Sequence, residues 1–220
     1  MISAIVLAAG KSSRMGQLKL LLPIAGRSMI RAVIESVLLS KAGEVILVLG
    51  NEAVRVRNDV ELLGTEFEAA KSKLKIVENL QFEEGQSTSL KVGLSMVEER
   101  SKGALILMGD QPFVEVGIIN KLIERFIETN PLMVIPQYPE GCASPVLFAR
   151  ALFPELMTIT GDKGGRSIVA KCLETEHRHR ISVVKVKSDL AGKDIDTWEE
   201  FQKLSAVRKG NGQYSERKTE

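Results

Sequence analysis

Two kinds of hydrophobic pattern alternate along the chain. Short, continuous apolar runs predict strands, and segments whose apolar residues recur every three or four positions predict amphipathic helices. Because the runs are apolar throughout, we expect strands that are buried on both faces of a parallel sheet. Strands alternating with helices predict an α/β domain whose mostly parallel sheet is covered by helices on both faces. The predicted strands cover residues 2–8, 44–49, 73–78, 104–108, 132–136, 145–148 and 182–187, with a short, strand-like segment at 194–196.

Helix-end signals refine this pattern. Ser28 is the predicted N-cap of the first helix. Thr197 and Glu200 have the spacing of a capping box, which predicts a last helix to about Val207. The polar composition that follows predicts one domain over residues 1–207 and a disordered tail over 208–220. Helical periods also run through residues 51–63, 90–97, 119–127 and 167–173.

Composition and charge narrow the classes of partner. The 30 Lys and Arg residues against 28 Asp and Glu residues give a net charge of +2, too small to indicate a nucleic-acid or membrane-surface partner. No apolar run approaches the roughly 20 residues that span a bilayer. We expect no export signal, because the chain enters a strand-like run at its start. Cys142 and Cys172 form neither a disulfide framework nor a metal-ligand spacing, so the expected location is the cytoplasm.

A glycine-containing basic loop follows the first predicted strand. Residues 10–16 combine glycines, hydroxyls and cations, and Lys19 follows them. Backbone N–H groups and cations at the end of a strand suit phosphate binding. The spacing is neither a Walker A loop nor the G-x-G-x-x-G of dinucleotide-binding folds. Taken alone, the loop is also compatible with a tight turn that carries solvated charges.

A longer match gives this loop a specific interpretation. The stretch L-A-A-G-K-S-S-R-M-G-x-x-K-L-L-L-P, residues 7–23, resembles the signature loop of nucleotidyltransferases related to the molybdenum cofactor guanylyl- and cytidylyltransferases. The resemblance implies a single Rossmann-like domain of the nucleotide-diphospho-sugar transferase type. It also implies that Arg14 and Lys19 neutralise a bound triphosphate. The nucleotide-binding residues it implies are Leu7, Ala8, Ala9, Gly10, Ser12, Ser13, Arg14, Lys19, Ser87, Thr88 and Ser89.

Three aspartates are candidate metal ligands. Asp110 directly follows a predicted strand, at the edge where open parallel sheets bind their ligands. Alternation in an extended segment puts Asp194 and Asp196 on one face, and hard divalent cations take oxygen ligands. Asp110 could instead start a turn, and Asp196 could serve the last helix. The resemblance implies that these acids bind the catalytic Mg²⁺, with Asp196 the preferred ligand of the C-terminal pair.

The nucleotide is suggested by two positions. The segment G-x-S-T-S-L, residues 85–90, resembles the base- and ribose-contacting segment of the cytidylyl branch. One hydroxyl of the three at 87–89 is expected to cap the following helix. The guanylyl branch typically has a second glycine where this chain has Ala9. The resemblance therefore favours CTP over GTP.

The acceptor region departs from the family pattern. Cytidylyltransferases of this group typically carry Gly-His-Pro before a Val/Leu-Phe strand, and this chain has Ala143-Ser144-Pro145 there. With Ser144 in place of that His, either Ser144 helps to hold the pterin in another way or the acceptor differs. The loop at 161–166 matches the family's G-D-x-G-x-R, so Ser144, Asp162 and Arg166 are the candidate acceptor-binding residues. A solvated loop that caps the next helix would explain residues 161–166 equally well.

These features lead to one expected activity and three alternatives. We expect Mg²⁺-dependent transfer of CMP from CTP to the terminal phosphate of molybdopterin, with Lys19, Arg14 and Asp110 as the catalytic residues. A molybdenum hydroxylase is a candidate client, and no nucleic-acid or membrane partner is expected. One alternative is guanylyl transfer, or nucleotidyl transfer to another phosphate. The others are a non-enzymatic protein that delivers the cofactor and an oxidoreductase that uses a nucleotide cofactor.

Overall fold

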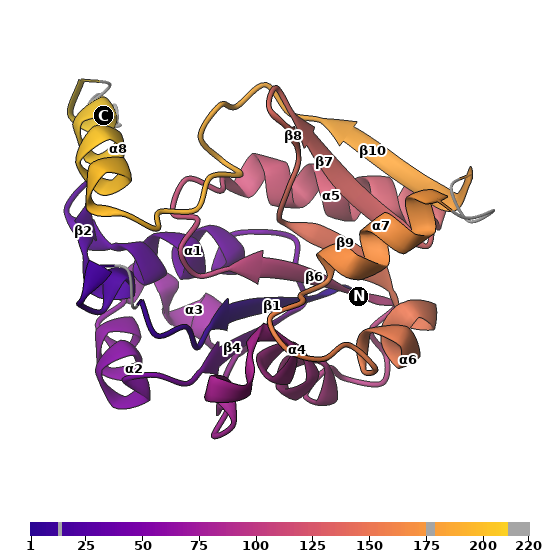
Figure 1. Cartoon of the computed structure of the whole chain (residues 1–220), viewed down its shortest axis with the longest axis horizontal. Helices are drawn as coiled ribbons and strands as arrows, with labels where there is room; N and C mark the ends of the chain where they lie inside the picture. The colour runs from indigo at the N-terminus through magenta and orange to yellow at the C-terminus, as the bar shows by residue number, and fades with distance from the viewer. Residues whose placement is uncertain (13–14, 175–178, 211–220) are drawn as a thin grey trace.

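A mixed sheet of eight strands forms the centre of the molecule. The computed structural model describes residues 1–12, 15–174 and 179–210. The strand order is β10-β7-β9-β6-β1-β4-β5, and β8 pairs with β7 (Figure 1). Strand β9 runs antiparallel to its neighbours β6 and β7, whereas β1, β4, β5 and β6 are parallel, as are β7 and β10. The strands are β1 Ser3–Ala8, β4 Glu44–Leu49, β5 Leu74–Glu78, β6 Gly103–Met108, β7 Met133–Tyr138, β8 Gly141–Cys142, β9 Val146–Ala149 and β10 Ile181–Lys185.

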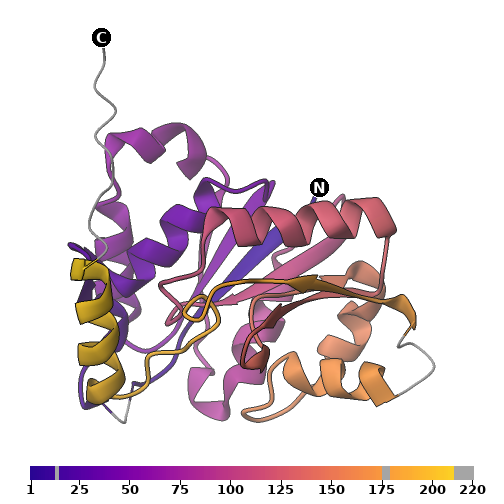
Figure 2. The ribbon, with the colours of Figure 1, turned by 90° about the horizontal axis from the view of Figure 1, so that it is seen from above.

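Helices cover both faces of this sheet, which confirms the predicted α/β architecture (Figure 2). One layer holds α1 Met29–Leu38, α2 Ala53–Glu61 and α5 Val116–Thr129. The other holds α4 Gln86–Ser95, α6 Phe153–Leu156 and α7 Arg166–Glu174. The remaining helices are α3 Glu68–Lys71 and α8 Trp198–Gly210, with 3-10 turns at Lys19–Leu21, Thr65–Phe67, Phe82–Glu84 and Arg150–Leu152. No helix in the described part of the chain is long and apolar enough to cross a membrane.

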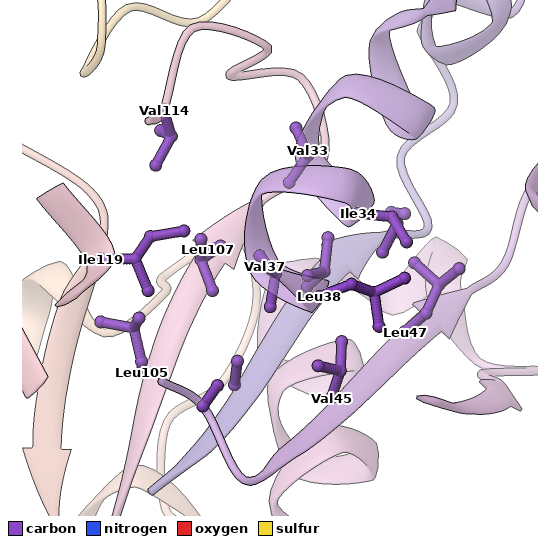
Figure 3. Packing of buried hydrophobic residues seen from close by; sticks show 14 of the residues in the cluster. Val33, Ile34, Val37, Leu38, Val45, Leu47, Leu105, Leu107, Val114 and Ile119 are labelled. Atoms are coloured by element: carbon purple, nitrogen blue, oxygen red, sulfur yellow. The ribbon is translucent and has the colours of Figure 1, made fainter. Parts of the chain in front are cut away.

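The apolar face of α1 packs the first helix layer against the sheet. Its 3.6-residue period places Val33, Ile34, Val37 and Leu38 over the sheet. There they belong to one buried cluster with strand residues that include Val45, Leu47 and Leu107 (Figure 3). Burying each such side chain contributes about 1.5–3 kcal/mol. The predicted N-cap is confirmed, since the Ser28 hydroxyl accepts a hydrogen bond from the backbone N–H of Arg31.

A smaller core ties the C-terminal segment to the start of the chain. Ile24, Met29, Phe113, Ile195 and Leu204 form a separate buried cluster. It joins α8 to a short hairpin made by β2 Pro23–Ile24 and β3 Arg27–Ser28. Figure 1 shows α8 beside β2 at one end of the molecule. This core brings the last described segment next to the first loop.

Several local expectations were wrong or incomplete. The segment 194–196 belongs to no strand, although the backbone N–H of Ile195 donates to the carbonyl of Asp110. None of the hydroxyls at 87–89 caps α4, because that helix begins at Gln86 and its N-cap is Gly85. The elements β2, β3, β8, α3 and α6 were not predicted, since they are too short to show a period. Helix α8 passes its predicted end, and residues 211–220 of the predicted tail lie outside the described residues.

A buried carboxylate anchors the opposite end of the sheet. Glu44 is 1% exposed at the start of β4. One carboxylate oxygen accepts hydrogen bonds from the Ser3 hydroxyl at 2.5 Å and from the backbone N–H of Glu98 at 3.3 Å. The other lies 2.6 Å from the Lys75 ammonium. The carboxylate therefore joins β1, β4 and β5 at their N-terminal ends.

Replacing Glu44 should destabilise the fold without altering the opposite edge. We expect Glu44→Ala to lower the free energy of unfolding by about 2–4 kcal/mol, because it leaves buried donors unsatisfied. Urea unfolding followed by circular dichroism measures the change. The matched variant Glu68→Ala should cost less than about 1 kcal/mol, because the Glu68 side chain is 64% exposed. Equal losses in the two variants would contradict the assignment of the effect to the buried carboxylate.

Candidate functional site

A cleft of about 560 Å³ opens where β1 and β6 end, at the C-terminal edge of the parallel strands. This is the edge at which open α/β sheets bind their ligands. Its walls come from the first loop, the turn before α4, the end of β6 and two C-terminal loops. The predicted site residues that line it are Leu7, Ala8, Ala9, Gly10, Ser12, Lys19, Ser89, Asp110, Asp162 and Asp196. Ser13 and Arg14, also predicted, lie outside the described residues.

The first loop leaves β1 and curls back on itself through Ser12. This residue has a φ of 53°, in the left-handed region that non-glycine residues seldom adopt. Its carbonyl accepts from the backbone N–H of Met15 at 3.1 Å, and its hydroxyl accepts from that of Lys19 at 3.3 Å. The loop lies close to the end of β4, because a Cβ added at Gly50 would come within 2.7 Å of the Ala9 methyl. These contacts fix where the Lys19 side chain enters the cleft.

Lys19 bridges two aspartates inside the cleft. Its ammonium lies 2.6 Å from Asp110 and 2.7 Å from Asp196, and its side chain is 11% exposed. Burial by itself lowers the pKa of Lys19, but the charge of Asp110 and the hydrogen bonds to both carboxylates outweigh it, so the pKa is raised. Lys19 is therefore positively charged at neutral pH. Three segments that are distant in sequence meet at this one ammonium group.

The acids of the cleft are suited to bind a divalent cation, and oxygen atoms of a bound substrate would complete its coordination. The Asp110 Oδ1 atom is buried and accepts no hydrogen bond from the described residues. Asp196 stands across Lys19 from it and lines the same cleft. Within the described ranges, no three His, Cys, Asp or Glu residues form a ready-made metal cage. Mg²⁺ is typically held by one or two carboxylates together with substrate phosphates, so this donor set is suitable.

Asp194 takes a different position from Asp196. Its Oδ1 atom accepts a 2.7 Å hydrogen bond from the Gln111 side chain, which also donates to the carbonyl of Gly192. Its other oxygen lies 3.9 Å from Arg166. Burial, reinforced by the charge of Asp110, raises the pKa of Asp194. Ile195 is fully buried between the two acids, so the predicted alternation of the side chains holds even though the segment joins no strand.

Gln111 is a site residue that sequence reasoning did not single out. It is fully buried beside Asp110, and it fixes the Asp194 carboxylate and the Gly192 backbone. The available signal was its place in Met-Gly-Asp-Gln-Pro, directly after the predicted ligand. A buried amide next to a functional acid is a natural positioning group, because buried polar groups form specific hydrogen bonds.

A second cavity of about 270 Å³ adjoins the cleft. It contains Ser144 and Arg166, two of the three predicted acceptor residues, together with Asp194. The third, Asp162, lines both spaces, as do Leu7, Gln86 and Met108. The two cavities therefore share a wall. The arrangement suits two ligands held side by side with their reacting groups in contact.

The hydroxyl cluster in the first turn of α4, residues 87–89, has a partly structural role. Asn79, which is buried, donates to the hydroxyls of Thr88 and Ser89 at 2.8 and 2.9 Å. The backbone N–H of Ser87 donates to the carbonyl of Gly161 at 3.1 Å. Of the three predicted hydroxyl residues, Ser89 lines the cleft, whereas Ser87 and Thr88 are not among its lining residues. Asn79 was not predicted, because nothing in its local sequence indicates these long-range partners.

Several known proteins are similar to this chain in sequence. "Purine catabolism protein PucB" of Bacillus subtilis is 28% identical over 90% of this chain and 92% of its own length. A "Probable molybdenum cofactor guanylyltransferase" of Thermococcus sibiricus is 29% identical over 84% of this chain and 94% of its own. "Nicotine blue oxidoreductase" of Paenarthrobacter nicotinovorans is 24% identical over 92% and 96%. These names cover more than one chemistry, so they leave the substrate of this chain open.

Solved structures agree with the fold, and a family model matches most of the chain. Rv0371c of Mycobacterium tuberculosis superposes with a TM-score of 0.76 at 28% identity, covering 93% of this chain and 97% of that one. The same protein has been solved as a complex with manganese, with a TM-score of 0.72 and coverage of 93% and 98%. The model of the MobA-like NTP transferase domain matches residues 4–180, more than half of the chain. The chain therefore belongs to the family of the MobA-like NTP transferase domain, and it is a nucleotidyltransferase.

Proposed function

We propose that the protein transfers CMP from CTP to the terminal phosphate of a molybdopterin-type acceptor, with Mg²⁺, and releases pyrophosphate. The observation that carries this proposal is the Lys19 ammonium held between Asp110 and Asp196 in the larger cleft. The adjoining cavity, which contains Ser144, Arg166 and Asp194, supplies a place for the acceptor. A molybdenum hydroxylase would be the client that receives the product.

The reaction is an in-line displacement at phosphorus. An oxygen of the acceptor phosphate attacks the α-phosphorus of CTP, and the bond from that phosphorus to the oxygen bridging to the β-phosphate breaks. Lys19 and the N–H groups of the first loop stabilise the negative charge that develops on the phosphate oxygens. Asp110 and Asp196 would hold Mg²⁺, which when bound neutralises triphosphate charge. Pyrophosphate carries away the displaced electron pair, and no covalent enzyme intermediate is needed.

The preference for CTP rests on the first loop and the start of α4. Ala9 lines the cleft and brings a methyl group where the guanylyl branch typically has glycine. Ser89, from the segment that resembles the cytidylyl branch, lines the same cleft. Guanylyl transfer is the second candidate, because a relative at 29% identity is named as a probable guanylyltransferase.

The nucleotide and the metal can be tested in one assay. We expect pyrophosphate release with CTP in the presence of molybdopterin and Mg²⁺, and at least about tenfold less with GTP, ATP or UTP. Chelation by EDTA should abolish release, and added Mg²⁺ should restore it, because the Lys19 ammonium alone does not neutralise two carboxylates and a triphosphate. A higher kcat/KM for GTP would replace the proposed nucleotide. Release that persists in EDTA would exclude the proposed metal.

Asp110 should be essential for turnover. We expect Asp110→Asn to reduce pyrophosphate release by about 10²–10³-fold, because it weakens the contact with Lys19 and removes a buried carboxylate oxygen suited to the metal. The matched acid-to-amide variant Glu68→Gln, on the surface of α3, should retain wild-type rates. Full activity in Asp110→Asn would contradict the proposed role of Asp110. A wild-type protein that releases no pyrophosphate would instead favour a protein that only binds and delivers the cofactor.

Arg166 should affect the acceptor and spare the nucleotide. It lines the smaller cavity and is 72% exposed, so Arg166→Met removes a cation there with little cost to the core. We expect the KM for the acceptor to rise about tenfold while the KM for CTP changes less than about twofold. Steady-state kinetics with each substrate varied in turn measure both values. A rise in the KM for CTP alone would show that the two cavities have been assigned in the wrong order.

A further inference from the structure

The first residue of α8 contacts the first loop directly. The indole N–H of Trp198 donates a 3.2 Å hydrogen bond to the backbone carbonyl of Met15. The two residues are 183 positions apart, so the contact exists only in the folded chain. Trp198 is 42% exposed and is not among the residues that line the cleft. Its indole therefore contacts the loop from outside the space where a ligand would lie.

Met15 lies in the part of the loop that delivers Lys19. Its side chain is buried, and its backbone N–H donates to the Ser12 carbonyl. The Ser12 hydroxyl in turn accepts from the backbone N–H of Lys19. A hydrogen bond to the Met15 carbonyl consequently restrains the same turn that fixes Ser12 and Lys19.

The first turn of α8 also restrains the other side of the cleft. The carboxylate of Glu200 accepts hydrogen bonds from the backbone N–H groups of Asp196 at 2.8 Å and Thr197 at 2.9 Å. The Thr197 hydroxyl accepts from the backbone N–H of Glu200, which completes the predicted capping box. Asp196 is thus held by its backbone while its side chain contacts Lys19.

Helix α8 is itself fixed to the body of the protein. Leu204 belongs to the small core with Ile24 and Met29, and Phe201 packs against that core. The rings of Trp198 and Phe201 meet edge to face with their centroids 5.7 Å apart. The indole N–H is therefore presented by an anchored helix and not by a free surface turn.

From these contacts we propose that Trp198 is a positioning residue for nucleotide binding. Its indole N–H holds the first loop against the capping turn that carries Asp196, so that Lys19 and the loop N–H groups are already arranged for the triphosphate. Preorganisation of this kind increases affinity, because less ordering is left to occur on binding. The inference rests on the proposed function, since it assumes that the cleft binds a nucleoside triphosphate.

The variant Trp198→Phe removes the N–H and keeps an aromatic ring beside Phe201. Isothermal titration of the full-length protein with CTP and Mg²⁺ should give a Kd about three- to tenfold higher than that of the wild type. In the pyrophosphate assay, the KM for CTP should rise to match, with kcat changed less than about twofold. Trp198 is the sole tryptophan of the chain, so CTP should also produce a saturable change in wild-type tryptophan fluorescence.

Phe126→Leu on α5 is the control for a general loss of core packing. Phe126 is buried in the main core beside Gly103, at the start of β6, and lies in a different buried cluster from Leu204 of α8. This variant should lower the Tm while the Kd for CTP stays within twofold of the wild-type value. Equal Kd values for wild type and Trp198→Phe would overturn the inference, as would a similar rise in Kd in Phe126→Leu. Those results leave the proposed function intact. If the wild type binds none of the four nucleotides, the proposed function fails, and this inference fails with it.

Discussion

The ion pairs of Lys19 are the constraint on which the cleft depends. Removing a charge from water costs several kcal/mol, and that cost is offset only by well-placed partners. Lys19 has two such partners, Asp110 at the end of β6 and Asp196 just before α8. Without the ammonium, two carboxylates would face each other across the cleft. The same group therefore stabilises the acids and keeps a positive charge inside the cleft.

The fold supplies these three side chains from its beginning, middle and end. Strands β1 and β6 are adjacent and parallel, so the first loop and Asp110 emerge at one edge of the sheet. Asp196 reaches the same edge because Ile195 is buried in the small core and donates its backbone N–H to the carbonyl of Asp110. Gln111 adds a second connection, through Asp194 and Gly192. A short buried segment thus aligns both C-terminal acids without belonging to the sheet.

Backbone contacts connect the walls of the two cavities. Gly85 has a φ of 110°, and a Cβ at that position would lie 2.4 Å from the carbonyl carbon of Gly161. Only glycine tolerates both the backbone angle and the close approach. Two residues further on, the backbone N–H of Ser87 donates to the Gly161 carbonyl. The turn that precedes α4 and the loop that lines the smaller cavity consequently form one unit, which keeps their facing walls in a fixed relation.

Local patterns determined the parts of this protein that depend on neighbouring residues. Continuous apolar runs defined strands such as β4, because a buried parallel strand needs no polar face, and the Ser28 and Thr197–Glu200 caps follow from spacing alone. The sequence also placed the first loop and Asp110 at the edge of the sheet where ligands bind, because the C-terminal ends of parallel strands meet at that edge. Three features could not be predicted in this way. Asp194 and Asp196 have different partners, Asn79 donates to the hydroxyls of Thr88 and Ser89, and the Trp198 indole donates to the Met15 carbonyl. Each depends on which distant segment packs alongside, and the tertiary structure decided it, because a hydrogen bond between distant residues leaves no periodic trace in the sequence.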